Sequence, residues 1–167
     1  DDSGEESDAF GLEFRGWGAL YSGNVTLSQE LPKLRYIDAY AFAEFEDQVV
    51  LSGPFPALVA IGEFAFYNAG LRHKTNAIVI EGALQLRSVG DHAFEGFNGA
   101  ISFEGPFPAL TDIGAWAFRM DTESYHYSSV ATIKDAPLLA SIGESAFWLF
   151  GGGYQYGGVL KVTGPFP

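Results

Sequence analysis

A nine-residue motif, Leu-x-x-Ile-Gly-x-x-Ala-Phe, recurs five times along this chain, with Asp38 in place of Gly in the first copy and Val89 in place of Ile in the third. Its Ile or Val stands at positions 37, 61, 89, 113 and 142, so successive copies are 24, 28, 24 and 29 residues apart. Repeats of this length are typical of stacked architectures, in which one unit cannot bury its apolar face alone. The spacing therefore predicts a solenoid.

The composition supports one well-packed domain. Of the 167 residues, 47% are hydrophobic and 16% are aromatic, which excludes a disordered chain. No apolar run reaches the roughly 20 residues of a membrane-spanning helix, and no basic segment followed by an apolar stretch opens the sequence as a signal peptide would. We therefore expect a soluble chain without membrane insertion.

The charge and the absence of cysteine exclude several functions. The formal net charge of -12 repels phosphate backbones, so we expect no nucleic acid as a partner. With no cysteine, the chain has no disulfides, no thiolate metal sites and no cysteine nucleophile. The compartment stays open, because a solenoid is stabilised by stacking and can be secreted without crosslinks.

The predicted solenoid is a single domain at residues 25–167, preceded by an atypical segment at residues 1–24. Residues 1–8 are acidic and lack apolar side chains, as expected of a solvated terminus. The following residues are rich in Gly and aromatic side chains, and Ala9-Phe10 resembles the end of the motif. We interpret them as a capping half-repeat, because an end unit has a neighbour on one side only.

Each unit also carries a short β-branched run ahead of the motif, which predicts one strand per repeat and about six stacked units. The expected strands lie at residues 25–27, 49–51, 78–80, 101–103, 131–133 and 160–162. Gly-Pro-Phe-Pro follows three of these runs, at residues 53–56, 105–108 and 164–167. Because proline fixes φ and lacks an N–H group, we expect the chain to leave the sheet at this tetrapeptide.

The motif itself supplies the expected interior. Its Leu and Ile point inward, and its Gly permits a sharp bend through positive φ or through close approach of another backbone. Ala and Phe then return to the core. Stacked repeats would align the phenylalanines in a ladder formed by Phe42, Phe66, Phe94, Phe118 and Phe147.

These motifs resemble the BspA-like class of leucine-rich repeats, whose units run approximately Leu-x-x-Ile-x-Ile-Pro-x-x-Leu-x-x-Ile-Gly-x-x-Ala-Phe. The resemblance covers residues 25–167. It implies a β-rich, right-handed coil with a parallel sheet on one side and turns or short helical turns on the other. It also implies a secreted or cell-surface protein of adhesion or recognition.

Three insertions interrupt the repeats and are candidate binding loops, because function concentrates in loops carried by a regular scaffold. One, after Phe66, holds the basic cluster Arg72, His73 and Lys74. The other two follow Phe118 and Phe147 and are rich in rings. Their candidate partner-binding residues are Tyr125, His126, Tyr127, Trp148, Tyr154 and Tyr156. Two interpretations stay open: local packing on the solenoid, or a partner surface.

The two ends of the sequence suggest self-association. Phe66 follows Pro56 by ten residues, and Phe10 would follow Pro167 by the same distance if two copies were joined head to tail. An open solenoid end exposes strand edges, and head-to-tail contact would propagate into a filament. The alternatives are that the chain is an excerpt of a longer array or that its ends are capped.

The sequence supplies little catalytic chemistry. No nucleophile elbow, P-loop, dinucleotide fingerprint or zinc-protease motif occurs, so we expect no enzyme, no catalytic residue, no cofactor and no metal. His92 reads as a surface or stacking residue. Asp121, Glu123 and His126 cannot supply by themselves the six or more oxygen ligands of a hard cation. Asn24 opens the one N-glycosylation sequon, which arises by chance or becomes occupied if a eukaryotic cell secretes the protein.

Together these features indicate a non-enzymatic extracellular or cell-surface protein with a structural or adhesive role. We expect it to mediate protein–protein interaction, with copies of itself end to end as the favoured partner. The alternative is a recognition module that binds a separate peptide or glycan through its aromatic loops.

Overall fold

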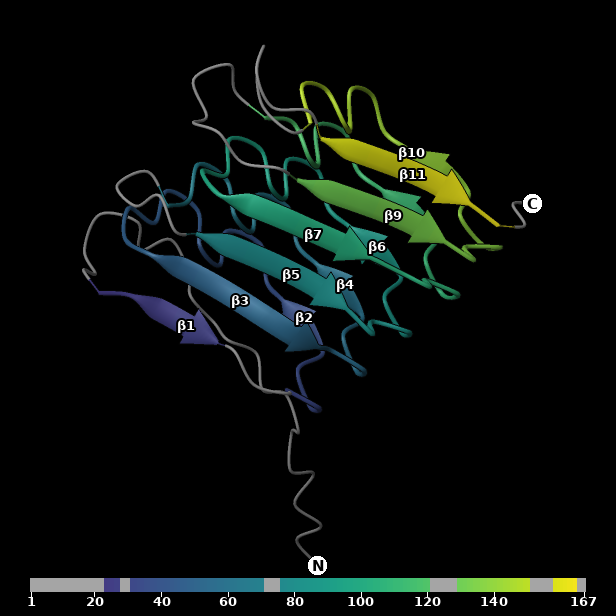
Figure 1. Cartoon of the computed structure of the whole chain (residues 1–167), viewed down its shortest axis with the longest axis horizontal. Coiled ribbons are helices and arrows are strands. Elements are labelled where there is room, and N and C mark those ends of the chain that lie inside the picture. The colour runs from purple at the N-terminus through teal and green to yellow at the C-terminus, as the bar shows by residue number, and fades with distance from the viewer. Residues whose placement is uncertain (1–22, 28–30, 71–75, 121–128, 151–157, 165–167) are drawn as a thin grey trace, which may run out of the picture.

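The computed structural model describes residues 23–27, 31–70, 76–120, 129–150 and 158–164. They fold into a parallel β-solenoid whose coils stack along one axis (Figure 1), which confirms the predicted β-rich solenoid. None of these residues is helical, and none therefore forms a helix long and apolar enough to cross a membrane.

Six strands form the longer sheet, in the order β1-β3-β5-β7-β9-β11, and all neighbouring strands are parallel. Each of the six predicted β-branched runs lies in one of them. Their bounds are β1 Val25–Leu27, β3 Val49–Pro54, β5 Ala77–Glu81, β7 Ala100–Glu104, β9 Val130–Lys134 and β11 Val159–Thr163. Side chains alternate between the core and the outer face along β3, β5, β7 and β9, as expected of a half-buried strand.

One Gly-Pro-Phe-Pro tetrapeptide leaves the sheet later than expected. Gly53 and Pro54 are the last residues of β3 and pair with β5, so the expectation that the tetrapeptide lies outside the sheet is wrong here. β1 pairs only with the first three residues of β3, so the other side of Pro54 faces no strand among the described residues. Proline is tolerated at such an edge because no ladder hydrogen bond needs its missing N–H group.

A second, shorter parallel sheet lies on another side of the coil, in the order β10-β8-β6-β4-β2. Each strand has two residues and ends on the Ile or Val of the motif. Their bounds are β2 Tyr36–Ile37, β4 Ala60–Ile61, β6 Ser88–Val89, β8 Asp112–Ile113 and β10 Ser141–Ile142. The sequence did not predict these strands, because two residues are too few to show an alternating pattern. In the described residues, strands and turns thus occupy the side where the resemblance implied turns or short helical turns.

The inward side chains of both sheets form one core between the layers. The Leu of the motif is at most 8% exposed in all five copies, and the Ile or Val is at most 3% exposed in the first four. The phenylalanine ladder is present: adjacent rings from Phe42 to Phe147 lie 5.0–5.1 Å apart between centroids and within 4–12° of parallel. This packing aligns equivalent side chains along the solenoid axis.

The motif glycine allows neighbouring coils to approach closely, and it does so without adopting a positive φ. None of the four motif glycines has a positive φ. A Cβ atom added to Gly90 would lie 2.5 Å from the backbone N of Glu63 in the preceding coil, and one added to Gly114 would lie 2.4 Å from that of Asp91. Real Cβ atoms do not approach this closely, so a side chain here would push the coils apart.

A buried polar side chain closes the turn that leads into the longer sheet. Asn76 is 2% exposed, and its Oδ1 accepts a hydrogen bond from the N–H group of Val49 at 2.9 Å. Its Nδ2 donates to the carbonyl oxygens of Gly70 and Asn98, both at 2.7 Å. Ser129 occupies the corresponding place two coils later, where its Oγ accepts from the N–H group of Ile101 at 3.2 Å. These side chains satisfy buried backbone groups that no strand pairs.

Candidate interaction surface

Trp148 is the one proposed loop residue that the structure describes. The other five proposed residues lie outside the described ranges; they are Tyr125, His126, Tyr127, Tyr154 and Tyr156. Trp148 is 49% exposed, and its ring meets that of Trp116 edge to face at 6.1 Å between centroids. Local packing and exposure are therefore both present at this residue.

Trp148 belongs to a cluster of aromatic and charged side chains. The guanidinium carbon of Arg119 lies 5.0 Å from the ring centres of both Trp116 and Trp148. Glu95 is 8% exposed, forms an ion pair with Arg119 and contacts Nδ1 of His92 at 2.5 Å. Glu95 thus joins Arg119 and His92 in one polar cluster beneath the two tryptophan rings.

His92 also belongs to a second ladder, formed by the variable residue that precedes the motif Ala. The Tyr40 and Phe64 rings stack at 5.1 Å, Phe64 and His92 stack at 4.6 Å, and the Trp116 ring is parallel to His92 at 6.4 Å. Each inner ring thus has neighbours on both faces, which leaves its edges toward solvent. A sugar ring stacks on an aromatic face, so this ladder does not favour glycan binding.

The described residues contain no group of three His, Asp or Glu side chains that could hold a metal ion. His73, Asp121 and Glu123 lie outside the described ranges. Hydrogen bonds from Ser141 and, to a smaller extent, Thr111 hold the pKa of the exposed Asp112 carboxyl below its ordinary value of 3.8. The Ser141 hydroxyl donates to Asp112 at 2.6 Å. This carboxylate stays ionised at neutral pH and links the last two coils.

Exposed apolar side chains lie on β10 and β11, and these two strands stand at the C-terminal end of the stack (Figure 1). Leu160 and Val162 are 44% and 42% exposed, whereas their register partners in β9 are fully buried. Ile142 is 48% exposed, whereas its partner in β8 is 1% exposed. These three residues occupy core positions of the repeat that no described coil covers.

A groove of about 270 Å³ opens at this end of the solenoid. Leu139, Ala140, Ser141, Ile142 and Val162 line it. Its walls therefore come from the shorter sheet on one side and from β11 on the other. In the inner coils the next coil fills this space.

Within the described residues, three backbone N–H groups at the same end have no acceptor. In the inner coils every second residue of the Ala-Phe turn donates to the following coil, as Trp116 and Phe118 donate to the carbonyl oxygens of the last coil at 2.9 and 2.7 Å. The corresponding donors of the last coil are Ser145, Phe147 and Leu149. Their N–H groups have no acceptor within the part of the chain that the structure describes. As far as the described residues go, this end thus lacks partners in both apolar packing and hydrogen bonding, and we call it the open end.

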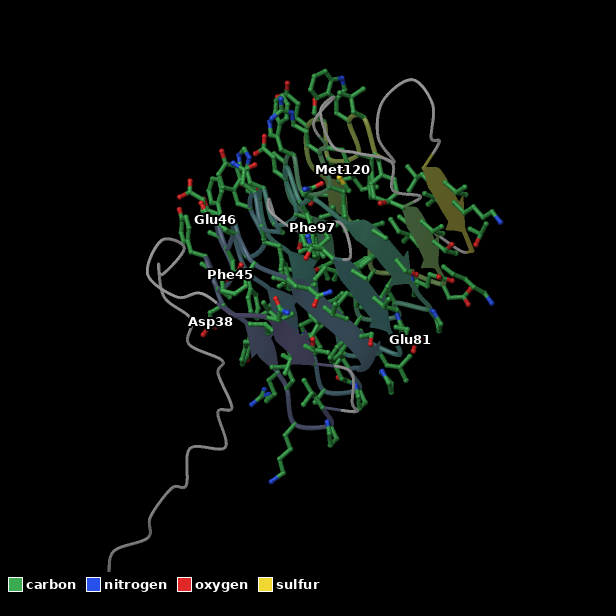
Figure 2. All side chains as sticks on the ribbon, turned by 60° about the vertical axis from the view of Figure 1, so that its left-hand side comes forward. Asp38, Phe45, Glu46, Glu81, Phe97 and Met120 are labelled. Carbon is green, nitrogen blue, oxygen red and sulfur yellow. The ribbon has the colours of Figure 1, made fainter. Side chains whose placement is uncertain are left out.

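The N-terminal end of the stack differs. Leu34, Ile37 and Phe42 are 4%, 3% and 5% exposed, so these motif positions of the first coil are covered, whereas Val25 and Leu27 of β1 are only partly buried. This coil also carries Asp38 where the other copies have glycine. Figure 2 shows Asp38 at the N-terminal margin of the stack. The two ends therefore present different surfaces.

The sequence predicted the residues of the open end as interior residues. Ile142, Leu160 and Val162 match the repeat pattern as well as their buried counterparts do. A pattern reports the place of a side chain within a coil, and it is silent about the neighbouring coil. The available signal was that they belong to the last copy of the motif in this sequence.

The described residues define the chain as a parallel β-solenoid. No family model, no curated protein and no solved structure matches its sequence or fold. The BspA-like resemblance therefore stays a prediction. Asn24, the sequon residue, is exposed next to β1 and accessible to modification, and its glycosylation likewise stays a prediction.

Proposed function

We propose that this chain is a non-enzymatic structural or adhesive protein that binds other proteins through its open end. The observation that carries this proposal is the exposure of Leu160, Val162 and Ile142 at positions that are buried in the inner coils. An uncovered strand edge with apolar side chains is a template for pairing with another chain. β11 offers such an edge, because β9 is its only paired strand among the described residues.

The partner that best fits the open end is a coil of the same repeat type on another protein. Such a coil would supply carbonyl acceptors for the N–H groups of Ser145, Phe147 and Leu149. It would also cover the three exposed aliphatic side chains, and burial stabilises each of them by about 1.5–3 kcal/mol at most. A partner without repeating strands would satisfy only one of these two requirements.

An extracellular or cell-surface setting accords with this role. The resemblance to BspA-like repeats implies adhesion, and the exposed Asn24 is a candidate glycosylation site. Of the proposed loop residues the structure describes Trp148, whose ring packs on that of Trp116, whereas the residues of the open end are described with their exposure. We therefore place the peptide- or glycan-binding alternative second.

A separate peptide with the sequence of residues 84–104 tests this function, because that segment contains one motif copy and the strand β7. We expect isothermal titration calorimetry to detect its binding to the full chain, and Leu160→Lys to abolish that binding by placing a charge on the open end. Leu84→Lys is the matched control, since Leu84 is 46% exposed and lies far from the open end in the stack. No binding to the unaltered chain, or equal binding to the Leu160→Lys variant, would contradict the proposal.

A further inference from the structure

We infer that two copies of this chain associate face to face through the outer side of the longer sheet, with the order of their strands reversed. This surface lies on the flank of the coils, so it is the same whether or not further coils adjoin those described. It is separate from the open end, and the two contacts are independent of each other.

The centre of this outer face is smooth and carries no charge. Figure 1 looks onto it, with the shorter sheet behind. Its outward side chains alternate with buried ones along the strands, and none is larger than valine. On β3, β5, β7 and β9 they are Val50, Ser52, Ala77, Val79, Ala100, Ser102, Val130 and Thr132, each only partly exposed. A sheet face that stays in water usually carries polar side chains, whereas an apolar face packs on a second sheet.

Four exposed charged side chains lie along one margin of the face, near the ends of the strands. The register places Glu81 of β5 beside Glu104 of β7. The same row continues through Thr132 of β9 to Lys161 of β11. Lys134 is the last residue of β9, two positions beyond Thr132. The margin is therefore acidic on β5 and β7 and basic on β9 and β11.

This arrangement leaves like charges side by side. Glu81 and Glu104 are register neighbours on adjacent strands, where like charges destabilise a sheet. Within the described residues the side chains of Glu81 and Lys161 form no ion pair, and Lys134 lies 3.9 Å from Asp135. A partner that brings a cation to the acidic half and an anion to the basic half would offset this repulsion.

A second copy of this chain supplies that charge pattern. A two-fold axis that runs parallel to the strands, between β7 and β9, exchanges β5 with β11 and β7 with β9. Residues of one row then meet across the axis, so Glu81 of one copy faces Lys161 of the other. Glu104 faces Thr132, and Lys134 lies on the diagonal. Because a two-fold contact is made twice, the acidic half of each copy meets the basic half of the other.

The neutral rows fit the same arrangement. Val79 of β5 faces Val159 of β11, and Ser102 of β7 faces Val130 of β9. Sheets that stack face to face lie about 10 Å apart, a space that short side chains fill. Only four strands of each copy oppose one another, so we expect weak and reversible association rather than a permanent dimer.

Two charge-reversed variants test this contact. Glu81→Lys combined with Glu104→Lys makes the whole margin basic, and Lys134→Glu combined with Lys161→Glu makes it acidic. In sedimentation from about 10 µM to about 1 mM, we expect the mass of the unaltered chain to rise from 18.0 kDa toward twice that value. Each double variant alone should associate at least about tenfold more weakly, and an equimolar mixture of the two should associate again.

Charge reversals away from this face are the matched controls. Lys33→Glu and Glu63→Lys alter exposed residues next to the shorter sheet, and they should leave the association unchanged. Leu160→Lys separates this contact from docking at the open end, because Leu160 occupies a core position of β11 rather than its outer face. We expect this variant to associate like the unaltered chain.

Three results would overturn the inference. The first is an unaltered chain that stays at 18.0 kDa up to the highest concentration. The second is a mixture of the two double variants that associates no better than either variant alone. The third is association that Leu160→Lys abolishes while both double variants retain it, which would place the contact at the open end. Failure of the open end to bind the peptide of residues 84–104 would leave this face-to-face contact unaffected.

Discussion

Single residues set how closely the coils of this solenoid approach one another. The motif glycine removes a side chain from each junction, and the residue two positions later, such as Phe64 or Trp116, adopts a left-handed φ of 53–57°. Bulky residues rarely adopt this conformation. Here it aims the N–H group at the following coil, where Phe64 donates to Asp91 at 3.0 Å. Hydrogen bonding between coils thus offsets local backbone strain.

An inner glycine should be intolerant of even a methyl group. We expect Gly114→Ala to lower the free energy of unfolding by about 1–3 kcal/mol or more, because its Cβ atom would overlap the backbone at Asp91. Urea denaturation followed by circular dichroism measures this loss. Ser88→Ala, on an outward position of β6, should change stability by less than about 0.5 kcal/mol. Equal stability of the two variants would show that the junction relaxes freely.

Asn76 should stabilise the fold more than Ser129, which occupies the corresponding position two coils later. Asn76→Leu removes the hydrogen bonds to the N–H group of Val49 and to the carbonyl oxygens of Gly70 and Asn98, and a buried group that loses its hydrogen bond costs about 1–3 kcal/mol. Ser129→Ala removes one bond only, to Ile101. We therefore expect the asparagine variant to lose at least twice as much unfolding free energy in the same denaturation experiment. A serine variant that is equally destabilised would contradict this count of bonds.

At the scale of elements, the repeat spacing predicts the longer sheet well and the shorter sheet not at all. β-branched runs mark β1, β3, β5, β7, β9 and β11 because each strand shows its own alternation, and the motif fixes which Leu, Ile and Phe point inward. The strands β2, β4, β6, β8 and β10 have two residues each, and pairing with neighbouring coils alone holds them extended. The position of Pro54 was predicted wrongly for a related reason. Whether the missing N–H group of this proline matters depends on the length of the neighbouring strand, which the sequence pattern does not give.

The phenylalanine ladder should contribute unequally along its length. We expect Phe94→Ala to lower the unfolding free energy by about 3–5 kcal/mol, because this ring is fully buried between two others. Phe147 has a stacked ladder neighbour on one side only and is partly exposed, so Phe147→Ala should lower it by less. Thermal unfolding of both variants ranks them. A larger loss of unfolding free energy for Phe147→Ala than for Phe94→Ala would contradict this prediction.

The contact between β8 and β10 gives a pH-dependent test. Ser141→Ala should raise the pKa of Asp112 toward 3.8, because the lost hydrogen bond favoured the ionised carboxylate. Since the pKa is lowered in the folded chain, this contribution to stability is present above pH 3.8 and is lost as the pH falls below it. Carboxyl chemical shifts during an NMR titration report the pKa. Thr111→Val should give a smaller shift in the same direction, and a downward shift in either variant would contradict the assignment.

At the scale of the whole molecule, the described coils stack along one axis, and the last of them carries exposed apolar side chains at core positions. The sequence predicts the axis, because the motif recurs at a nearly constant period. It could not predict the difference between the ends, since exposure at Leu160 or Ile142 depends on a neighbouring coil rather than on the residue itself. The aromatic loops that drew attention in the sequence contribute one described residue, Trp148, and its ring packs on Trp116 and Arg119.

Amide hydrogen exchange along the native chain tests this central claim most directly. The account predicts slow exchange in β5 and β7, which have strands on both sides, and fast exchange at Ser145, Phe147 and Leu149 and along the uncovered side of β11. Protection of these C-terminal amides at the level of β7, in the isolated chain at low concentration, would show that the end is closed and would contradict the account.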